Sequence, residues 1–520
     1  MNVSYHLLDS MHATTPPPSF AGSKRRVRMF ALMLTALSVV HHQHASAQEP
    51  PSSELMSLAI ENELLSTDAV DSRDLGVSAD RGIVTLSGTV DSLRAKQHAT
   101  RLAKLIRGVQ SVINQMIVEP GTREDELLTL DVEQALTQNS ATESYEVLVA
   151  VQNGIAHLGG NVDSHAEKRL AADVASGVAG IREVDNRLKV QSPDQRPDKE
   201  LRAEVEGLIG GSARLEDAEI TTSLENGSVV LTGEVGALIE RDIAEELASV
   251  NGVKSVDVRG LRINPSIRNG QRRIERYKSV TDDSIAEAVR LTLRHDPRVL
   301  SFADQINVES RNAVVTLRGK VGHALARQAA NESAQNTLGV DRVRDRLQVE
   351  WSGDDINDEQ IAEYVRQALI RDAYVGRRDL IVRSRRAHVD LFGQVESQFE
   401  KQAAEYTANS QRGVVHVNNH LTVTDEWEPR SDEEIQEAIA EKLKWAFFDR
   451  ANDIKVRVDN GVALLRGTVQ TRRQWQRVMD IAVEAGARRP HNQLRIQLRP
   501  QSGRTPLYVP TQPGGEPPQR

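Results

Sequence analysis

Cysteine is absent from the chain of 520 residues. Its absence excludes disulfides, Cys-ligated zinc and iron–sulfur centres, thiol nucleophiles and attachment of a lipid through cysteine. Aromatic residues make up only 3% of the chain, which argues against surfaces that stack sugars or bases on rings. The hydrophobic share of 39%, with 33 glycines in addition, is ordinary for a globular protein. Because a single hydrophobic core seldom holds so many residues, we expect several domains.

Motifs that carry catalysis are absent as well. The sequence has no H-E-x-x-H zinc motif, no G-x-S-x-G nucleophile elbow, no G-x-x-x-x-G-K-[ST] phosphate loop and no G-x-G-x-x-G after a predicted strand. We therefore predict that the protein is not an enzyme and has no cofactor and no metal site. One acidic cluster lacks the bidentate glutamate of a calcium loop and suits the positive end of a helix. It consists of Asp354, Asp355, Asn357 and Asp358.

The longest apolar run lies near the N-terminus. Residues 29–40 follow a basic segment from Lys24 to Arg28 and precede Ala45-Ser46-Ala47, which is the pattern of a secretory signal peptide. We predict a signal peptide over residues 1–47, cleaved after Ala47, and a soluble exported protein. An uncleaved membrane anchor is the alternative. The three histidines at 41, 42 and 44 would leave with the signal peptide and are not assigned to a metal.

A phrase of nine residues with a glycine near its end occurs six times. It reads GIVTLSGTV at its first occurrence and GVALLRGTV at its last. A second glycine follows each of the six after 19 or 20 residues, which indicates internal repeats. The glycines that mark the six repeats are Gly88, Gly160, Gly233, Gly319, Gly393 and Gly467.

Each repeat has the pattern of helix, strand, strand, helix, strand. Apolar residues alternate around the marking glycine, as in a strand with one buried face, and a helix rich in alanine follows. We expect the glycine to let that helix approach the strand closely. The first two strands are expected to form a hairpin over turns such as Asn153-Gly154. In repeats 4 and 5 Ala313 and Ala387 replace the turn glycine, which predicts a different turn there.

Prolines between the repeats indicate the boundaries, because proline is costly inside a helix or a central strand. We predict repeats at 52–119, 124–191, 198–264, 281–350, 357–424 and 431–498, a basic linker at 265–280 and a disordered tail at 501–520. Ser431 and Asp358 are expected to cap the opening helices of repeats 6 and 5. The sequence leaves open whether the third strands of repeats 3 and 6 are intact. Leu261 stands one residue out of phase in repeat 3, and Pro490 replaces a valine in repeat 6.

The closing phrase of a repeat is clearest in repeats 2 and 5. Gly180-Ile181 precedes Val184, Asn186, Leu188 and Val190, and Gly413-Val414 precedes Val417, Asn419, Leu421 and Val423. With the opening helix, the V-x-L-x-G-x-V hairpin and the alanine-rich helix, this phrase resembles the BON domain, named for bacterial osmotically inducible and nodulation proteins. The resemblance covers residues 54–498. It implies an α+β fold, a tandem array of six small αββαβ sandwiches, each a three-stranded mixed sheet packed against two helices. It also implies a non-enzymatic envelope role, with phospholipid binding or protection under osmotic stress.

The sign of the charge changes along the chain. Residues 124–191 carry twelve Asp and Glu against five Lys and Arg, and residues 198–264 carry fourteen against seven, a net charge of −7 each. The linker at 265–280 has a net charge of +4, and residues 431–500 have +3. The whole chain has −9, or −12 without the signal peptide, so we predict no nucleic-acid partner.

Two basic segments are candidate lipid-binding sites, because cations attract anionic headgroups and aromatic rings suit the membrane interface. In the linker they are Arg272, Arg273, Arg276 and Lys278; in repeat 6 they are Lys442, Lys444, Trp445, Phe447, Phe448, Arg472, Arg473, Trp475 and Arg477. Trp475 has polar neighbours and is predicted to be exposed. The alternatives are that the linker is a solvated connection or lengthens the opening helix of repeat 4, and that Trp445 and Phe448 fill the core of repeat 6.

The leading hypothesis is therefore a periplasmic array of BON-like repeats that binds anionic phospholipid surfaces, weakly per repeat and more strongly through several repeats. Such binding would support envelope integrity or osmotic-stress tolerance. The alternative is a structural scaffold or spacer that binds other envelope proteins through its acidic middle repeats. An enzyme is the third possibility, and it would require a polar cleft with converging titratable groups.

Overall fold

The computed structural model describes residues 52–496, apart from gaps at 68, 71, 192–195, 268–279, 352–355, 377, 425–430, 448–453, 470–471 and 488. The predicted signal peptide and tail lie outside the described residues. So do Phe448, Asp354 and Asp355, and the linker cations Arg272, Arg273, Arg276 and Lys278. The repeats belong to one compact unit, Pro50–Arg520. Among the described helices, none is both long and apolar enough to cross a membrane.

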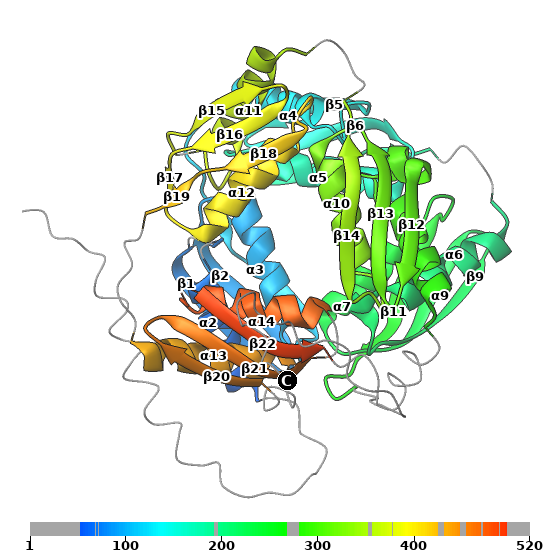
Figure 1. The fold of residues 1–520 in the computed structure, drawn as a ribbon, viewed down its shortest axis with the longest axis vertical. Coiled ribbons are helices and arrows are strands. Elements are labelled where there is room, and N and C mark those ends of the chain that lie inside the picture. Colours follow the sequence, from blue (N-terminus) through cyan, green and yellow to red (C-terminus); the bar gives the residue numbers. More distant parts are fainter. Residues whose placement is uncertain are drawn as a thin grey trace, which may run out of the picture. The chain divides into compact units, whose positions relative to one another are not determined.

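The first three repeats contain the predicted elements in the predicted order (Figure 1). Repeat 1 comprises α2 (Ser53–Ser66), β1 (Ser72–Asp80), β2 (Ile83–Val90), α3 (Leu93–Leu105), β3 (Ser111–Asn114) and β4 (Ile117–Val118). Repeat 2 comprises α4 (Asp125–Gln138), β5 (Glu146–Gln152), β6 (Ile155–Val162), α5 (His165–Ser176), β7 (Glu183–Asn186) and β8 (Lys189–Val190). Repeat 3 comprises α6 (Asp198–Gly211), the short η1 (Ala213–Leu215), β9 (Glu219–Glu225), β10 (Ser228–Val235), α7 (Leu238–Ala248) and β11 (Ser255–Ile263).

The last three repeats follow the same order. Repeat 4 comprises α9 (Asp282–His295), η2 (Leu300–Gln305), β12 (Ile306–Arg311), β13 (Val314–Val321), α10 (Ala324–Gln335) and β14 (Arg342–Val349). Repeat 5 comprises α11 (Asp358–Arg371), β15 (Ile381–Arg385), β16 (His388–Phe392), β17 (Gln394–Val395), α12 (Gln398–Asn409), β18 (His416–Asn419) and β19 (Thr422–Val423). Repeat 6 comprises α13 (Asp432–Phe447), β20 (Ile454–Asp459), β21 (Val462–Val469), α14 (Arg472–Glu484) and β22 (Arg489–Ile496).

Each repeat is a mixed sheet packed against two helices, which confirms the predicted α+β fold. In repeat 4 the strand order is β12-β13-β14, with β12 antiparallel and β14 parallel to the central β13. Alternate residues of β13, such as Val315 and Leu317, are buried against Val289 of α9 and Ala330 of α10. The alanines of the second helix face this core, as the sequence predicted.

In repeats 2 to 6 the hairpin turn is held by an acidic residue at the first position of the opening helix, and in repeat 1 the hydroxyl of Ser53 accepts from the turn at Arg81. In repeat 2 the Asp125 carboxylate accepts hydrogen bonds from the backbone N–H groups of Asn153 (2.7 Å) and Gly154 (2.9 Å). Asp198, Asp282, Asp358 and Asp432 bind the turns of repeats 3 to 6 in the same way. In these five repeats the carboxylate ties the opening helix to the hairpin of the same repeat.

Of the two predicted helix caps, the one at Asp358 is wrong and the one at Ser431 is confirmed. Asp358 binds the turn of repeat 5, and the cap of α11 is Asn357, whose side chain accepts from the backbone of Gln360 at 2.9 Å. The prediction that Asp358 caps this helix was therefore wrong. Ser431 does cap α13, because its hydroxyl accepts from the backbone N–H of Glu434 at 3.2 Å.

The turns of repeats 4 and 5 were predicted to differ from the others, and this prediction was wrong. Ala313 and Ala387 have φ angles of 63° and 61°, in the left-handed region that Gly154 occupies in repeat 2 at 74°. The carboxylates of Asp282 and Asp358 bind these turns at 2.9 Å and 2.8 Å and hold them in that conformation. Because an L-residue with a Cβ is strained there by about 1 kcal/mol or more, both alanines store backbone strain.

Replacing Ala313 or Ala387 with glycine should therefore stabilise the protein. Relief of the left-handed strain, set against the larger entropy of glycine in the unfolded chain, should raise the free energy of unfolding by roughly 0.5 to 1 kcal/mol per site. Denaturant unfolding of the full chain measures the change. The reverse substitution, Gly154→Ala, is the matched control and should destabilise the protein. A loss of stability in Ala313→Gly would contradict this explanation of the turn.

Glycine is required at the six marking positions for a different reason from the one predicted from the sequence. All six have φ between 113° and 142°, a region that is open essentially to glycine alone. An added Cβ at Gly233 would lie 1.9 Å from the carbonyl oxygen of Glu219, on the neighbouring strand of the hairpin. At Gly319 the corresponding distance to the Gln305 oxygen is 2.1 Å. The atom that leaves no room for a side chain is thus a backbone carbonyl oxygen of the same hairpin. The prediction that glycine makes room for the second helix was wrong.

The asparagine of the closing phrase ties the third strand to the second helix. The side-chain oxygen of Asn186 accepts from the backbone N–H of Leu188 at 3.2 Å, and its Nδ2 donates to the Lys168 carbonyl on α5 at 2.7 Å. Asn114 and Asn419 make the equivalent two bonds in repeats 1 and 5. This local turn divides the third strand into two short parts, such as β7 and β8.

The third strands of repeats 3 and 6, which the sequence left in question, are intact. In repeat 3 the register between β10 and β11 shifts by one residue between Val230 and Thr232, which is a β-bulge that restores the phase of Leu261. In repeat 6 the strand β22 pairs with β21 over its full length, including Pro490 opposite Ala463. Proline is tolerated at this position because β22 lies at the edge of its sheet.

Candidate functional site

Two cations of the predicted lipid site in repeat 6 make contacts with repeat 1. The Lys442 ammonium on α13 lies 2.8 Å from the Glu63 carboxylate on α2, and Arg477 on α14 lies 3.3 Å from it. Glu63 and Lys442 are largely buried, with side-chain exposures of 17% and 12%. These two cations therefore join repeats within the chain, which is a contact that the sequence did not predict.

The other predicted residues of repeat 6 lie on the same two helices. Trp475 is only partly buried but packs against the core of its own repeat, so the prediction of an exposed ring was wrong. Lys444, Trp445 and Phe447 fall in the last turn of α13, and Arg472 and Arg473 open α14. The placement of their side chains lies outside what the structure describes.

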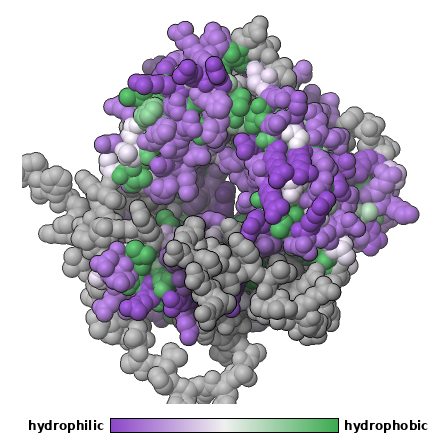
Figure 2. All heavy atoms as spheres, in the orientation of Figure 1, coloured by the Kyte–Doolittle hydropathy of each residue, from purple (hydrophilic) through white to green (hydrophobic). Residues whose placement is uncertain are grey.

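The structure shows a second cationic surface, on the open face of the repeat 4 sheet. Arg342, Arg344 and Arg346 alternate along β14 with residues that face the core, and all three are exposed. Arg311 and Arg318 join Arg344 around a depression on the same face. We call the set of Arg311, Arg318, Lys320, Arg342, Arg344 and Arg346 the repeat 4 cationic face. Figure 2 shows hydrophilic side chains over the β12–β14 sheet.

The three arginines of β14 differ from the others in their pairing. Arg311 and Arg318 lie 3.9 Å and 3.4 Å from Glu309, and Lys320 lies 2.8 Å from Glu350. For Arg342, Arg344 and Arg346 the described residues provide no carboxylate within ion-pairing distance. These guanidinium groups are therefore available to an external anion.

Repeat 6 has a similar face, and repeat 3 has the opposite charge. Lys455, Arg457, Arg466 and Arg495 are exposed on the open side of the β20–β22 sheet. In repeat 3 the corresponding face carries Glu219, Glu225, Glu234 and Asp257, and its arginines Arg259 and Arg262 are held by Asp257 and Glu234 at 2.6 Å and 3.0 Å. The open sheet faces thus reproduce the change of charge along the chain.

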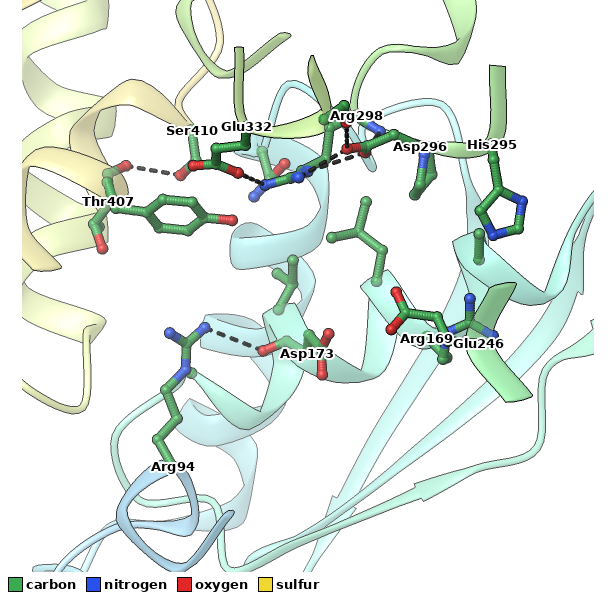
Figure 3. Close-up of a pocket in the computed structure, with 18 of the residues that line it drawn as sticks. Arg94, Arg169, Asp173, Glu246, His295, Asp296, Arg298, Glu332, Thr407 and Ser410 are labelled. Carbon is green, nitrogen blue, oxygen red and sulfur yellow. Dashed lines mark hydrogen bonds and ion pairs between the residues drawn. The ribbon is translucent and has the colours of Figure 1, made fainter. Parts of the chain in front are cut away.

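A polar pocket of about 360 Å³ opens where repeats 2, 3, 4 and 5 meet, with Arg94 of repeat 1 at its margin. Figure 3 shows charged side chains that converge on it from separate helices. Arg298 donates to Asp296 at 2.8 Å and to Glu332 at 2.9 Å. Burial opposes ionisation of Asp296, but its hydrogen bonds from Arg298 prevail and lower the pKa of this carboxyl group. Arg94 donates to the backbone carbonyl of Asp173 at 3.2 Å.

Two titratable groups of the pocket are shifted by burial. Burial lowers the pKa of His295, which keeps its ring neutral at pH 7, and its Nε2 has no hydrogen-bond partner. Burial raises the pKa of Asp173. Catalysis by His295 as a base would need a nucleophile beside it. Among the described hydroxyl groups of the lining, Thr407 donates to Asp372 and Ser333 to Asp296, and none is hydrogen-bonded to His295. The pocket therefore lies at a junction of repeats, with ion pairs formed inside repeats 3 and 4, and it provides no nucleophile–base pair among the described residues.

The described residues also contain no group of three or more His, Asp or Glu side chains that could hold a metal ion. The prediction of no metal site is not tested by this finding, because residues such as Asp354 and Asp355 lie outside the description.

Comparison with known proteins agrees with the fold. A model of the BON domain matches residues 56–120, 124–192, 197–265, 281–350, 357–425 and 431–497. Osmotically-inducible protein Y of Escherichia coli (strain K12) is 32% identical over 135 residues, which cover 25% of this chain and 67% of that protein. Outer membrane lipoprotein DolP of Haemophilus influenzae is 33% identical over 108 residues, 20% of this chain and 55% of that protein. The chain thus spans about half the length of this lipoprotein.

Among solved structures, the C-terminal domain of CdsD, a structural protein of the type III secretion system of Chlamydia trachomatis, is 15% identical. The match covers 37% of this chain and 90% of that domain with a TM-score of 0.12, which is too low to support an argument. The family match rests instead on six copies of one unit that together cover most of the sequence. The chain belongs to the BON domain family.

Proposed function

We propose that this protein is a non-enzymatic component of the bacterial envelope that binds anionic phospholipid surfaces and supports the envelope under osmotic stress. Its similarity to Osmotically-inducible protein Y and to an outer membrane lipoprotein supports an envelope-associated role in osmotic stress. Because the chain has no cysteine, it cannot carry a lipid on that residue as a lipoprotein does. Contact with the membrane would depend on its surface charge.

The observation that carries the proposal is the row of exposed, unpaired arginines on β14. Arg342, Arg344 and Arg346 alternate along one strand and are exposed on the same open face of the sheet, so they can contact one anionic surface together. A cation near an anionic membrane contributes about 1 kcal/mol. The basic linker immediately precedes repeat 4 in the sequence, and repeat 6 carries a further cationic face, so several sites can bind in concert.

Flotation of the full chain with vesicles tests the proposal. The protein should float with phosphatidylglycerol or cardiolipin vesicles at low salt, should be released by high salt, and should not float with phosphatidylcholine vesicles. Replacing Arg342, Arg344 and Arg346 with glutamine should weaken binding about a hundredfold, since three cations of about 1 kcal/mol each are lost.

A control with the same change of net charge separates the arginine row from general electrostatics. In repeat 3 the side chains of Arg202, Arg259 and Arg262 are held by Glu206, Asp257 and Glu234. Replacing these three with glutamine should leave binding within a few fold of the parent. If both triple variants bind equally, the arginine row is not the site. If the parent shows no salt-sensitive flotation, lipid binding is rejected and the scaffold hypothesis is preferred.

The site predicted from sequence needs its own variant. Replacing Arg472, Arg473 and Trp475 with alanine should weaken flotation if the start of α14 also contacts lipid. Unchanged flotation in this variant would remove the α14 residues from the proposal and leave the sheet face as the contact.

A further inference from the structure

Repeats 2 and 5 bind each other through a symmetric contact. The backbone N–H of Arg412, after α12, donates to the carbonyl of Gln138 at the end of α4 at 2.9 Å, and Ser140 N–H donates to the Ser410 carbonyl at 2.8 Å. The same two bonds occur with the repeats exchanged. Ala179 N–H donates to the Arg371 carbonyl at 2.8 Å, and Ala373 N–H donates to the Gly177 carbonyl at 3.0 Å. Such reciprocity is the signature of a two-fold interface, in which one surface patch contacts its own copy.

Side chains reinforce this contact. Arg371 is buried, with 4% exposure, and donates to the side-chain oxygens of Gln134 (2.8 Å) and Gln138 (2.7 Å) on α4. Arg412 forms an ion pair with Glu143. A buried guanidinium that finds its partners only in another repeat indicates a permanent interface.

Repeats 3 and 4 make one half of the same contact. Ala213 N–H donates to the Asn336 carbonyl at 2.8 Å, and Leu338 N–H donates to the Gly211 carbonyl at 2.7 Å. Suppose that the chain consists of two halves of three repeats each, related by this two-fold axis. Exchange of the halves then replaces repeat 3 with repeat 6 and repeat 4 with repeat 1, so the contact between repeats 3 and 4 corresponds to a contact between repeats 6 and 1. Those two repeats are joined by Glu63, through Lys442 and Arg477.

The sequence supports the same division independently. The distance from the marking glycine to the second glycine is 19 residues in repeats 3 and 6 and 20 in the other four. Repeats 3 and 6 are each the third of their half. Between the halves stands the basic linker, which lengthens the spacing of marking glycines to 86 residues, against 72 to 74 elsewhere.

We propose that the chain is a covalently joined pair of three-repeat modules, residues 52–264 and 281–498, which recognise each other through the symmetric contact of repeats 2 and 5. The patch formed by the helix ends at 138–140 and 177–179 is then a docking surface whose partner is a second module of the same kind. The interface holds the modules together without the linker. This role is separate from lipid binding and involves none of the arginines of β14.

Cutting the linker of the folded protein tests the proposal. A protease site inserted within residues 268–279 of the full chain allows the linker to be cut after folding. The two fragments should elute together from a size-exclusion column, at the volume of the uncut chain. Separation of the fragments, or loss of one of them by unfolding, would contradict the proposal.

Variants of the interface show whether this contact is the cause. After cutting, Arg412→Glu should weaken association of the fragments at least tenfold, because it places two acids together, and adding Glu143→Arg should restore it. Arg366→Ala is the control, since Arg366 lies on the same helix as Arg371 but pairs with Glu363 within that helix. Each uncut variant is first shown to keep the far-UV circular dichroism of the parent. If Arg412→Glu has no effect, or if the charge exchange does not restore association, the docking patch is assigned wrongly.

Discussion

Replacing Gly233 with alanine is expected to lower the free energy of unfolding by at least about 3 kcal/mol. Gly233 has a φ of 126°, which alanine adopts only with strain. Its Cβ would also lie 1.9 Å from the Glu219 carbonyl oxygen, a backbone atom that cannot rotate away. The hairpin of β9 and β10 would have to open. Denaturant unfolding of the full chain measures the loss, and hydrogen exchange of the β10 amides assigns it to repeat 3.

Gly210 is the matched control in the same repeat. It lies within α6, and an added Cβ would meet no atom within 4 Å. Gly210→Ala should therefore stabilise the helix by about 0.5 to 1 kcal/mol. The two substitutions change the free energy of unfolding in opposite directions only if the contact between the added Cβ and the Glu219 carbonyl determines the effect at Gly233. Equal effects of Gly233→Ala and Gly210→Ala would show that the marking glycines are tolerant positions.

Acidification is expected to destabilise repeat 4 through His323. This side chain is 4% exposed and caps α10, since its Nδ1 accepts from the backbone N–H of Ala326 at 3.0 Å. Burial lowers the pKa of His323 from 6.5 to about 4. The unfolded chain therefore binds the proton more readily, and stability present above pH 6.5 is lost as the pH falls towards 4. The pKa difference corresponds to roughly 3 kcal/mol.

Serine supplies the control, because Ser92, Ser164 and Ser397 cap the equivalent helices of repeats 1, 2 and 5. His323→Ser should keep the cap but remove this titration. It should also lower stability at pH 7, since the contact of the histidine ring with Phe302 is lost. Unfolding measured between pH 4 and pH 7 distinguishes the variants. An unchanged pH dependence in His323→Ser would show that other groups cause the acid sensitivity.

The fold could be predicted because the same sequence pattern occurs six times in the chain. The periodicity around the marking glycines gives the central strand, and the alanines give the face of the second helix. The reason why glycine is required at these positions could not be predicted. The φ angle of the glycine and its distance to the carbonyl of Glu219 or Gln305 depend on the register of the hairpin. The turns at Ala313 and Ala387 were missed for a related reason. A carboxylate 31 residues before Ala313 and 29 residues before Ala387 holds these turns, and this partner outweighs the local preference of alanine.

The candidate site was harder to predict than the fold. Repeat 4 contains ten Lys and Arg and ten Asp and Glu, so its net charge hides the cationic face. The alternation of Arg342, Arg344 and Arg346 is the signal that would have revealed it, because every second residue of a strand shares a face. For Lys442 and Arg477 the charges are visible in the sequence but their partner is not, because Glu63 on α2 lies 379 and 414 residues away from them.

The arginine row of β14 also has a consequence for the edge of its sheet. The strand β14 is the last in the order β12-β13-β14, so one side of its backbone is not paired within that sheet. An open edge can pair with the same edge of another molecule and begin aggregation. Two copies that approached along β14 would bring like charges together at three successive positions. The arginines therefore keep concentrated molecules apart, and a variant that removes their charge is expected to be less soluble even where it remains fully folded.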